Sequence, residues 1–281
     1  MTTYDVHQHF LPPPFVEVLR SRREPPCLTG STLELREGSF PFDERDNDLG
    51  ERIARLDADG SDVAVISLAP TMETEAHPEL CDAYHEGMRE ALTAAEGRFR
   101  ALAAGVCLED FSGTCVSAQA VVAGLGDLPG ELARRGQVLF VHPGPPAAAP
   151  AEAPAWWAPV VDYTAQMQAA YFAWLAVGAE RHPELDVVFA VLAGGAPIQL
   201  ERLRSRGAAL EAALSPRVHL DTASYGSPAL RLCAESVGAE RLVFGSDVPV
   251  IDAGPTLHAL ADLGEAVVAL ARSETPARLF A

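Results

Sequence analysis

Short runs of apolar and β-branched residues alternate with longer amphipathic stretches along the chain. This alternation is typical of repeated β/α units built around a parallel sheet. The short runs predict eight strands, at residues 4–9, 63–68, 102–107, 115–120, 137–142, 186–192, 218–222 and 241–246. Because eight parallel strands close into a barrel, the pattern predicts an α/β fold of the (β/α)8 TIM-barrel type.

The amphipathic stretches predict helices between the strands, at residues 50–58, 79–96, 131–135, 160–181, 197–214, 228–236 and 255–271. Two other stretches are expected to be long irregular loops, namely 20–45 after the first strand and the proline- and alanine-rich segment 142–157 after the fifth. Loops that follow the strands of a barrel lie on its catalytic face. Both are therefore candidate lids or substrate walls, although the second also fits a solvated loop.

The length of 281 residues suits one barrel domain that spans residues 1–281. The chain contains no run of about 18 uncharged apolar residues that would span a bilayer. Its N-terminus lacks the basic and apolar regions of an export signal. The five cysteines include no C-x-x-C pair, which is typical of free thiols in a reducing compartment. We therefore expect a cytoplasmic protein.

The net charge of -18 disfavours nucleic acids and anionic membranes as partners, because both select clustered positive charge. All 21 basic residues are arginine. The absence of lysine excludes a phosphate-loop lysine, a Schiff-base lysine and a carboxylated lysine that bridges two metal ions. A small-molecule substrate is the expected partner.

Four polar residues stand at the predicted carboxyl ends of strands, where a barrel places its chemistry. His7 and His9 are two apart on the first strand, so both imidazoles leave the same face and point into the barrel. His142 ends the fifth strand, and Asp247 follows the eighth. Three neutral imidazoles and one carboxylate suit one divalent ion, Zn2+ in the first place and Mn2+ in the second. The pattern of His7 and His9 alone would also arise from two core histidines that are hydrogen-bonded to neighbouring residues.

At these residues the chain resembles a known family. The segments DVHQHFLPP, FVHPG, HPELDVVFAVLAGGAP, LDTASYGSP and RLVFGSDVP are similar, in order and spacing, to segments of the amidohydrolase superfamily. The similar branch is the one typified by aminocarboxymuconate semialdehyde decarboxylase and the γ-resorcylate-type decarboxylases. The resemblance covers nearly the whole chain. It implies a homodimer and a barrel with one divalent metal, whose ligand positions are His7, His9, His142 and Asp247.

One position departs from the family pattern. The members that the chain resembles read A-H-x-G-G-x-x-P at the sixth strand, whereas FAVLAGGAP places Val191 where they have a histidine that orients or deprotonates metal-bound water. A positioned acid or base contributes roughly 10²–10⁴ in rate. Either Asp247 moves the proton from its ligand position, or another side chain substitutes, or the barrel has lost the reaction and binds a metabolite or partner. Each candidate substitute also fits a structural role; they are His219, Asp221, Ser224 and Tyr225.

Substrate contacts are predicted at Arg45, Trp156, Ser224 and Tyr225. A guanidinium such as that of Arg45 or Arg52 can bind a substrate carboxylate through two hydrogen bonds. Alternatively, these arginines lie in a surface loop and balance the charge of nearby acidic residues. Trp156 and Phe10 are candidates to line the binding site of a flat substrate. The alternatives for both are packing in the rim and a dimer contact.

We expect first a metal-dependent hydrolase of a small carboxylated or cyclic amide, ester or lactone, in which metal-bound hydroxide attacks the carbonyl and Asp247 takes and returns the proton. The alternative is a non-oxidative decarboxylase of a small aromatic or unsaturated acid, the chemistry of the named relatives. Val191 disfavours both reactions, and decarboxylation slightly more. A non-catalytic metabolite-binding barrel is the third hypothesis, disfavoured because loss of function would free four polar core residues to become apolar.

Overall fold

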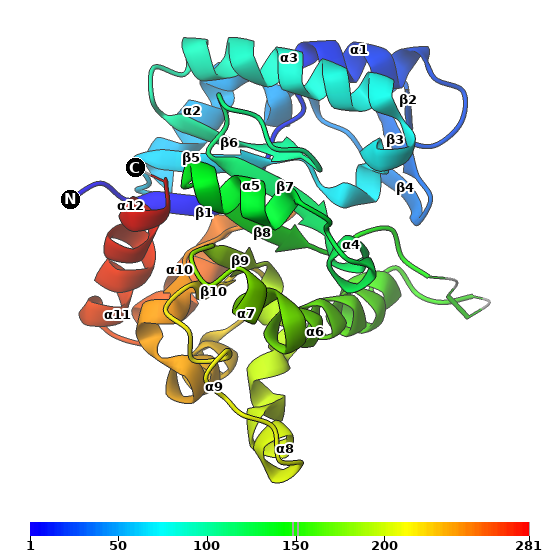
Figure 1. Ribbon diagram of the computed structural model, residues 1–281. Coiled ribbons are helices and arrows are strands. Elements are labelled where there is room, and N and C mark those ends of the chain that lie inside the picture. The colour runs from blue at the N-terminus through cyan, green and yellow to red at the C-terminus, as the bar shows by residue number, and fades with distance from the viewer. Residues whose placement is uncertain (148, 151, 281) are drawn as a thin grey trace.

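The computed structural model describes residues 1–147, 149–150 and 152–280 (Figure 1). Eight parallel strands form one sheet, and their order in the sheet follows their order along the chain. The strands are β1 (Tyr4–His9), β5 (Val63–Ser67), β6 (Phe99–Ala104), β7 (Gly113–Ser117), β8 (Val138–His142), β9 (Val187–Phe189), β10 (Val218–Asp221) and β11 (Leu242–Val243). This arrangement confirms the predicted α/β barrel. Ala148 and Ala151, in the long segment expected after the fifth strand, lie outside the described residues.

The barrel closes between β1 and the segment that follows β11. The amide of His9 donates to the carbonyl of Val248, and the amide of Asp247 donates to the carbonyl of His7, each at 2.8 Å. A parallel bridge also pairs Gln8 with Val248. These bonds fix the register of the first strand against the last part of the barrel, and they place its two histidines beside Asp247.

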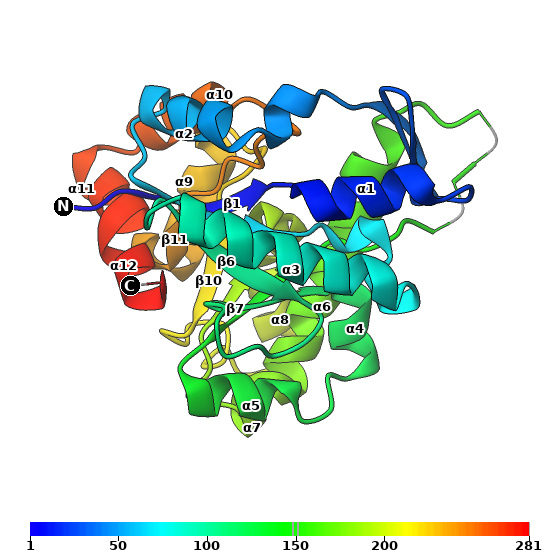
Figure 2. The ribbon, with the colours of Figure 1, turned by 90° about the horizontal axis from the view of Figure 1, so that it is seen from above.

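Helices cover the outside of the barrel (Figures 1 and 2). They are α1 (Pro13–Ser21), α2 (Leu49–Ala58), α3 (Pro78–Ala94), α4 (Ala118–Ala123), α5 (Leu128–Arg135), α6 (Tyr163–Ala173), α7 (Ala179–Arg181), α8 (Leu200–Ser205), α9 (Ser227–Val237), α10 (Ala253–Ala261), α11 (Glu265–Ala269) and α12 (Thr275–Phe280). Between β6 and β7 the chain crosses without a helix, through residues 105–112. Within the described ranges, every helix is too short or too polar to cross a membrane.

Buried apolar side chains hold the strands to the helices in two clusters. The larger cluster includes Leu139 of β8 and Tyr171 of α6. The smaller one joins Phe15 of α1 and Tyr84 of α3 to strands β5 and β6. Phe10 belongs to this smaller cluster and is 2% exposed, so it packs in the core and does not wall a substrate.

Residues 20–45 are not the irregular loop that the sequence predicts. They contain a three-stranded antiparallel sheet, made of β2 (Cys27–Thr29), β3 (Thr32–Leu35) and β4 (Gly38–Pro41). Alternation along β3 buries Leu33 and Leu35, whereas the residues between them are half-buried. Strands of three or four residues are shorter than, or at the lower limit of, the runs that indicate a strand, which is why the pattern missed them.

Several predicted boundaries are also wrong. β6 spans Phe99–Ala104 and not 102–107, because the chain turns at Gly105, whose φ is 69°. β9 ends at Phe189, since the residues that follow adopt left-handed backbone and leave the sheet. The predicted helix 197–214 is an α-helix only in α8. The predicted helix 255–271 is interrupted at Gly264, whose φ of 101° lies outside the helical region.

Candidate metal centre

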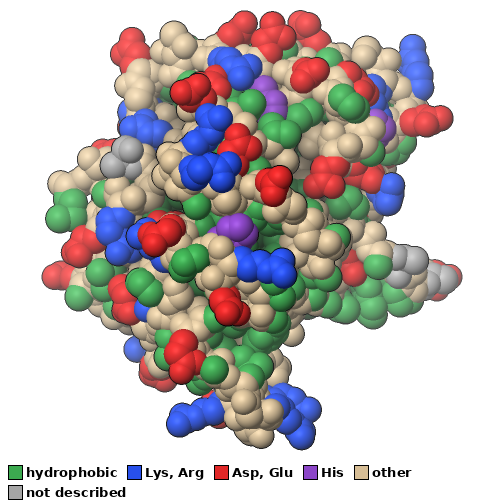
Figure 3. Space-filling model, viewed as in Figure 1, with side chains coloured by type: hydrophobic (Ala, Val, Ile, Leu, Met, Phe, Trp, Pro, Cys, Tyr) green, Lys and Arg blue, Asp and Glu red, His purple; other side chains and the backbone are tan. Residues whose placement is uncertain are grey.

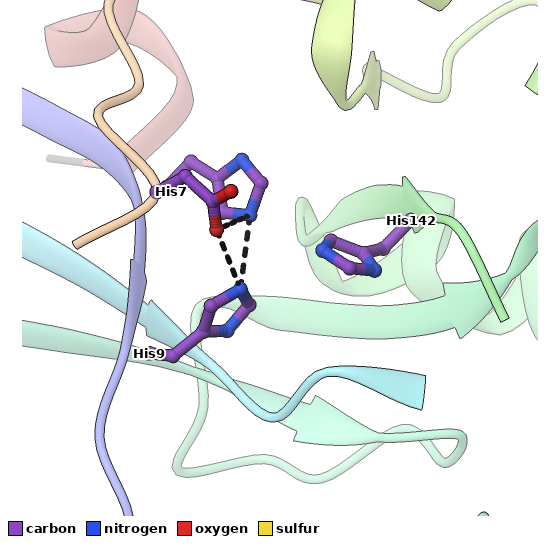
Figure 4. A group of neighbouring side chains, drawn as sticks. His7, His9 and His142 are labelled. Carbon is purple, nitrogen blue, oxygen red and sulfur yellow. Dashed lines mark hydrogen bonds and ion pairs between the residues drawn. The ribbon is translucent and has the colours of Figure 1, made fainter. Parts of the chain in front are cut away.

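Three histidines and one aspartate meet at the carboxyl end of the barrel. His7 and His9 come from β1, His142 ends β8, and Asp247 follows β11. One possible ligand atom of each lies within 4.8 Å of those of the others, so the group could hold a metal ion. Figure 4 shows the three imidazoles converging from the two strands. All four residues predicted as metal ligands are thus brought together.

In each of the three imidazoles, Nδ1 faces a fixed acceptor. The distances are 2.7 Å for His7 and Asp221 Oδ2, 3.0 Å for His9 and the carbonyl of Ser67, and 2.8 Å for His142 and the carbonyl of Pro143. A ring nitrogen that faces an acceptor carries the proton, so Nε2 presents a lone pair to the shared space. The Nε2 atoms of His7 and His9 are 3.2 Å apart. Two lone pairs at this distance repel unless a proton or a metal cation lies between them, and the set of three imidazoles and one carboxylate fits a divalent ion.

The electrostatics of the group also favour a cation. Burial opposes charge on His7, yet the carboxylates of Asp221 and Asp247 raise its pKa to about 9. Burial likewise opposes charge on Asp247, but the hydrogen bond with His9 and the neighbouring imidazoles lower the pKa of this carboxyl. For His142, burial and the adjacent histidines hold the pKa well below its usual value. The carboxylates that raise the pKa of His7 thus make a site that favours positive charge.

A tight turn after β11 presents Asp247. Its φ of 68° lies in the left-handed region, which aspartate tolerates better than most residues. A Cβ added at Gly245 would lie 2.7 Å from the Cβ of His7 and 3.0 Å from the carboxylate carbon of Asp221. The missing side chain of Gly245 therefore permits this segment to pack directly against the His7 and Asp221 pair.

A cavity of about 880 Å³ opens beside these side chains. His9, His142 and Asp247 form part of its lining, and Val191 lies in the same lining. The three-stranded sheet supplies an apolar part of the wall, through Leu33, Leu35 and Phe40. The volume lies in the range of roughly 300–1,000 Å³ that is typical of small-molecule pockets.

Val191 begins a run of left-handed backbone. The angle φ is 46° at Val191, 51° at Leu192 and at Ala193, and 62° at Gly194. A positive φ is a rare conformation for a β-branched residue such as valine. A Cβ at Gly194 would lie 2.4 Å from the carbonyl oxygen of Thr164, so glycine is required where the run meets α6. The run turns the chain from β9 into the wall of the cavity, at the position where the family pattern has a histidine.

The predicted substrate contacts lie in different places. Arg45 lines the cavity, but its side chain is 80% exposed and binds Asp43. Trp156 is 56% exposed, Ser224 is exposed, and Tyr225 is half-buried against the core. Within the described part of the chain, none of these three lines the cavity. The four assignments stay predictions.

Two of the candidate substitutes for the missing base are engaged elsewhere. Asp221 binds His7, and His219 Nε2 lies 3.3 Å from Asp186 Oδ1. Neither side chain is exposed. These contacts give both residues a structural role. Asp221 contacts a candidate metal ligand, whereas His219 contacts none of the four.

A second polar pair lies in the cavity, and the sequence pattern does not predict it. Tyr163, the first residue of α6, donates to the carboxylate of Glu37, which lies in the turn between β3 and β4. Both side chains line the cavity. Burial raises the pKa of both groups. The two residues are 126 positions apart, so no local pattern connects them.

Arg52, which was considered as a substrate clamp, is buried beside β1. It is 2% exposed. Its guanidinium donates to Gln8 Oε1 (2.5 Å) and to the carbonyls of His9 and Asp46. Burial lowers the pKa of Arg52 to about 10. The side chain therefore fixes the carboxyl end of β1, where the two histidines emerge.

Comparison with solved structures finds the same fold in several enzymes. IDCase from Metarhizium anisopliae matches with a TM-score of 0.78 and 17% identity, over 99% of this chain and 97% of that one. The 5-carboxyvanillate decarboxylase of Sphingomonas paucimobilis matches with a TM-score of 0.73 and 17% identity, over 100% of this chain and 99% of that one. A dihydroxybenzoic acid decarboxylase from Polaromonas sp. JS666, with bound manganese and the inhibitor 2-nitroresorcinol, matches with a TM-score of 0.74 and 15% identity, over 99% and 96%.

A search of curated protein sequences finds no match. The model of the amidohydrolase family matches residues 4–281, a range that contains every strand of the barrel and all four candidate ligands. The chain therefore belongs to the amidohydrolase family of enzymes.

Proposed function

We propose that this chain is a metal-dependent decarboxylase, which removes CO2 from a small acid without oxidising it. One observation carries the proposal: the wall beside the candidate ligands is largely apolar. The similar structures add support, since they include decarboxylases of 5-carboxyvanillate and of dihydroxybenzoic acid. Hydrolysis, the first expectation from the sequence, has less support.

The proposed metal ligands are His7, His9 and His142 through Nε2 and Asp247 through its carboxylate. When bound, a divalent ion supplies a Lewis acid that polarises the carboxylate of the substrate and an adjacent oxygen. Imidazole and carboxylate donors suit both Zn2+ and Mn2+. The manganese in the Polaromonas structure makes Mn2+ the first ion to test.

Decarboxylation breaks the bond between the carboxylate carbon and its neighbour. CO2 leaves, the electron pair stays on the neighbouring carbon, and that carbon takes one proton. Asp247 is the proposed proton carrier, because its side chain is 15% exposed and lines the cavity. The proton is drawn from the solvent.

The apolar wall favours this reaction over attack by water. A largely apolar cavity lowers the hydration of a substrate carboxylate, and decarboxylation converts the charged group into neutral CO2. Hydrolysis needs an attacking water, and an apolar wall offers few polar atoms to hold one.

The test is a screen of the Mn2+-loaded protein in D2O with small aromatic monocarboxylic acids, including 2,6-dihydroxybenzoate. We expect CO2 release together with deuterium at the vacated carbon, detected by NMR. Asp247→Asn and His142→Ala should abolish both signals. Asp252→Asn, which changes a carboxylate that is 86% exposed, should leave them unchanged. Acid release from amides, esters or lactones without CO2 release would contradict the proposal.

A further inference from the structure

Acidic side chains outnumber basic ones in the lining of the cavity. Among the described residues of the lining, the one basic side chain is Arg45, whereas the acidic ones are Glu37, Asp43, Glu44, Asp46 and Asp247. On the face drawn in Figure 3, acidic side chains gather along the upper part, with basic ones scattered between them. The chain itself therefore offers little positive charge to an anionic ligand.

The charge of Arg45 is already engaged. Its guanidinium donates to Asp43, at 2.7 Å from Nη2 and 3.2 Å from Nε. The same pair raises the pKa of Arg45 and lowers that of Asp43. A second acidic residue of the lining, Glu44, forms an ion pair with Arg20, at 2.5 Å between Oε1 and Nη2. Much of the charge of Arg45 is therefore balanced within the chain.

The proposed metal centre balances one anionic group. A divalent ion held by three neutral imidazoles and one carboxylate carries a net charge of about +1. One ligand carboxylate brings this charge to about zero. A second carboxylate in the cavity would stay uncompensated, and the burial of an unpaired charge is unfavourable.

The rest of the cavity suits an apolar group. Leu33 and Leu35 are each 9% exposed and come from β3, while Phe40 comes from β4. Met72 and Leu11 extend the apolar lining. With a volume of about 880 Å³, the cavity leaves room for more than a single ring.

Glu37 strengthens the selection against anions. It stands in the turn between β3 and β4, accepts a hydrogen bond from Tyr163, and lines the cavity. A second anionic group of a ligand would approach this carboxyl across an apolar wall, where charges are poorly screened. A neutral group at the same place meets no such repulsion.

From the charge balance and the apolar wall, we infer that the preferred substrate is a monocarboxylate with an extended apolar body, and that the three-stranded sheet rejects a second anionic group. The inference rests on the proposed function, because it places the single carboxylate at the metal. It assigns substrate selection to β3 and β4, which lie in a segment whose sequence pattern predicts an irregular loop.

The test uses Co2+-loaded protein, whose visible absorption changes when a carboxylate reaches the metal. The probes are benzoate, 4-tert-butylbenzoate and benzene-1,4-dicarboxylate. We expect 4-tert-butylbenzoate to bind at least tenfold more tightly than the dicarboxylate. Phe40→Arg should reverse this order, because it adds a cation to the wall at a position that is 41% exposed and tolerates a charge. Val250→Arg, at a second lining residue that is 68% exposed, should shift the ratio in the same direction.

The matched control is Leu232→Arg, which adds the same charge on α9 at a residue that is 41% exposed and outside the cavity lining. It should keep the wild-type preference. Equal or tighter binding of the dicarboxylate by the wild type would overturn the inference and leave the proposed decarboxylation standing. If none of the three acids changes the Co2+ spectrum, a carboxylate does not reach the metal, and both the inference and the proposed function fail.

Discussion

His7 and Asp221 are joined at 2.7 Å between Nδ1 and Oδ2, and neither side chain has any exposed surface. The carboxylate fixes the tautomer of the imidazole and directs Nε2 toward the proposed metal position. We expect Asp221→Asn, which keeps the shape and removes the charge, to weaken metal affinity by roughly 10–100-fold. Competition with a chromophoric chelator measures this change.

The control for that prediction is Asp186→Asn. Asp186 also contacts a buried histidine, since its Oδ1 lies 3.3 Å from Nε2 of His219, but this pair is not part of the candidate metal centre. Its replacement should leave metal affinity within a factor of two. Equal losses in the two variants would mean that general destabilisation, and not orientation of His7, explains the effect.

Metal removal should lower stability. We expect close to one equivalent of metal per chain after purification without chelator, and a clear drop in Tm after its removal. A ligand at 100 times its Kd stabilises the native state by about 2.7 kcal/mol. In His7→Ala and Asp247→Ala, Tm should no longer respond to added Mn2+. His258→Ala, at an exposed position on α10, should respond like the wild type.

Val191→His tests the departure from the family pattern. At a φ of 46°, histidine is better tolerated than a β-branched residue, so we expect no loss of stability in urea unfolding. The new imidazole would line the cavity as an acid or base, which contributes roughly 10²–10⁴ in rate when it is well placed. Turnover should therefore rise and acquire a dependence on pH near 6 to 7, about the usual pKa of histidine. Unchanged turnover would show that the reaction does not lack a base at this position.

Glu37 should make stability depend on pH. Its pKa in the folded protein lies above 4.5, chiefly because of burial and against the effect of the Tyr163 hydrogen bond. The stability that the protonated carboxyl contributes is complete below pH 4.5 and is lost as the pH rises through the folded-state pKa. Glu37→Gln does not titrate. The free energy of unfolding of the variant, relative to the wild type, should therefore grow as the pH rises above 4.5, in urea titrations at constant metal concentration. A constant difference across this range would contradict the assignment.

The barrel and the four candidate ligands could be predicted because both depend on local features. A short apolar run indicates a strand, and in a parallel barrel the ends of all strands share one rim, so His7 and Asp247 are expected together without knowledge of packing. The Tyr163 and Glu37 contact could not be predicted, because it joins a helix start to a turn 126 residues away. The sequence pattern extends β9 beyond its end, because valine favours strands, whereas Val191 has a positive φ that the pattern does not reveal.

The bonds that close the barrel also determine when the ligand set becomes complete. His7 and His9 belong to β1, whereas Asp247 follows β11, the last strand of the barrel. The four candidate ligands therefore come together only when the segment after β11 has packed against β1. Binding of the proposed metal would accordingly report closure of the barrel.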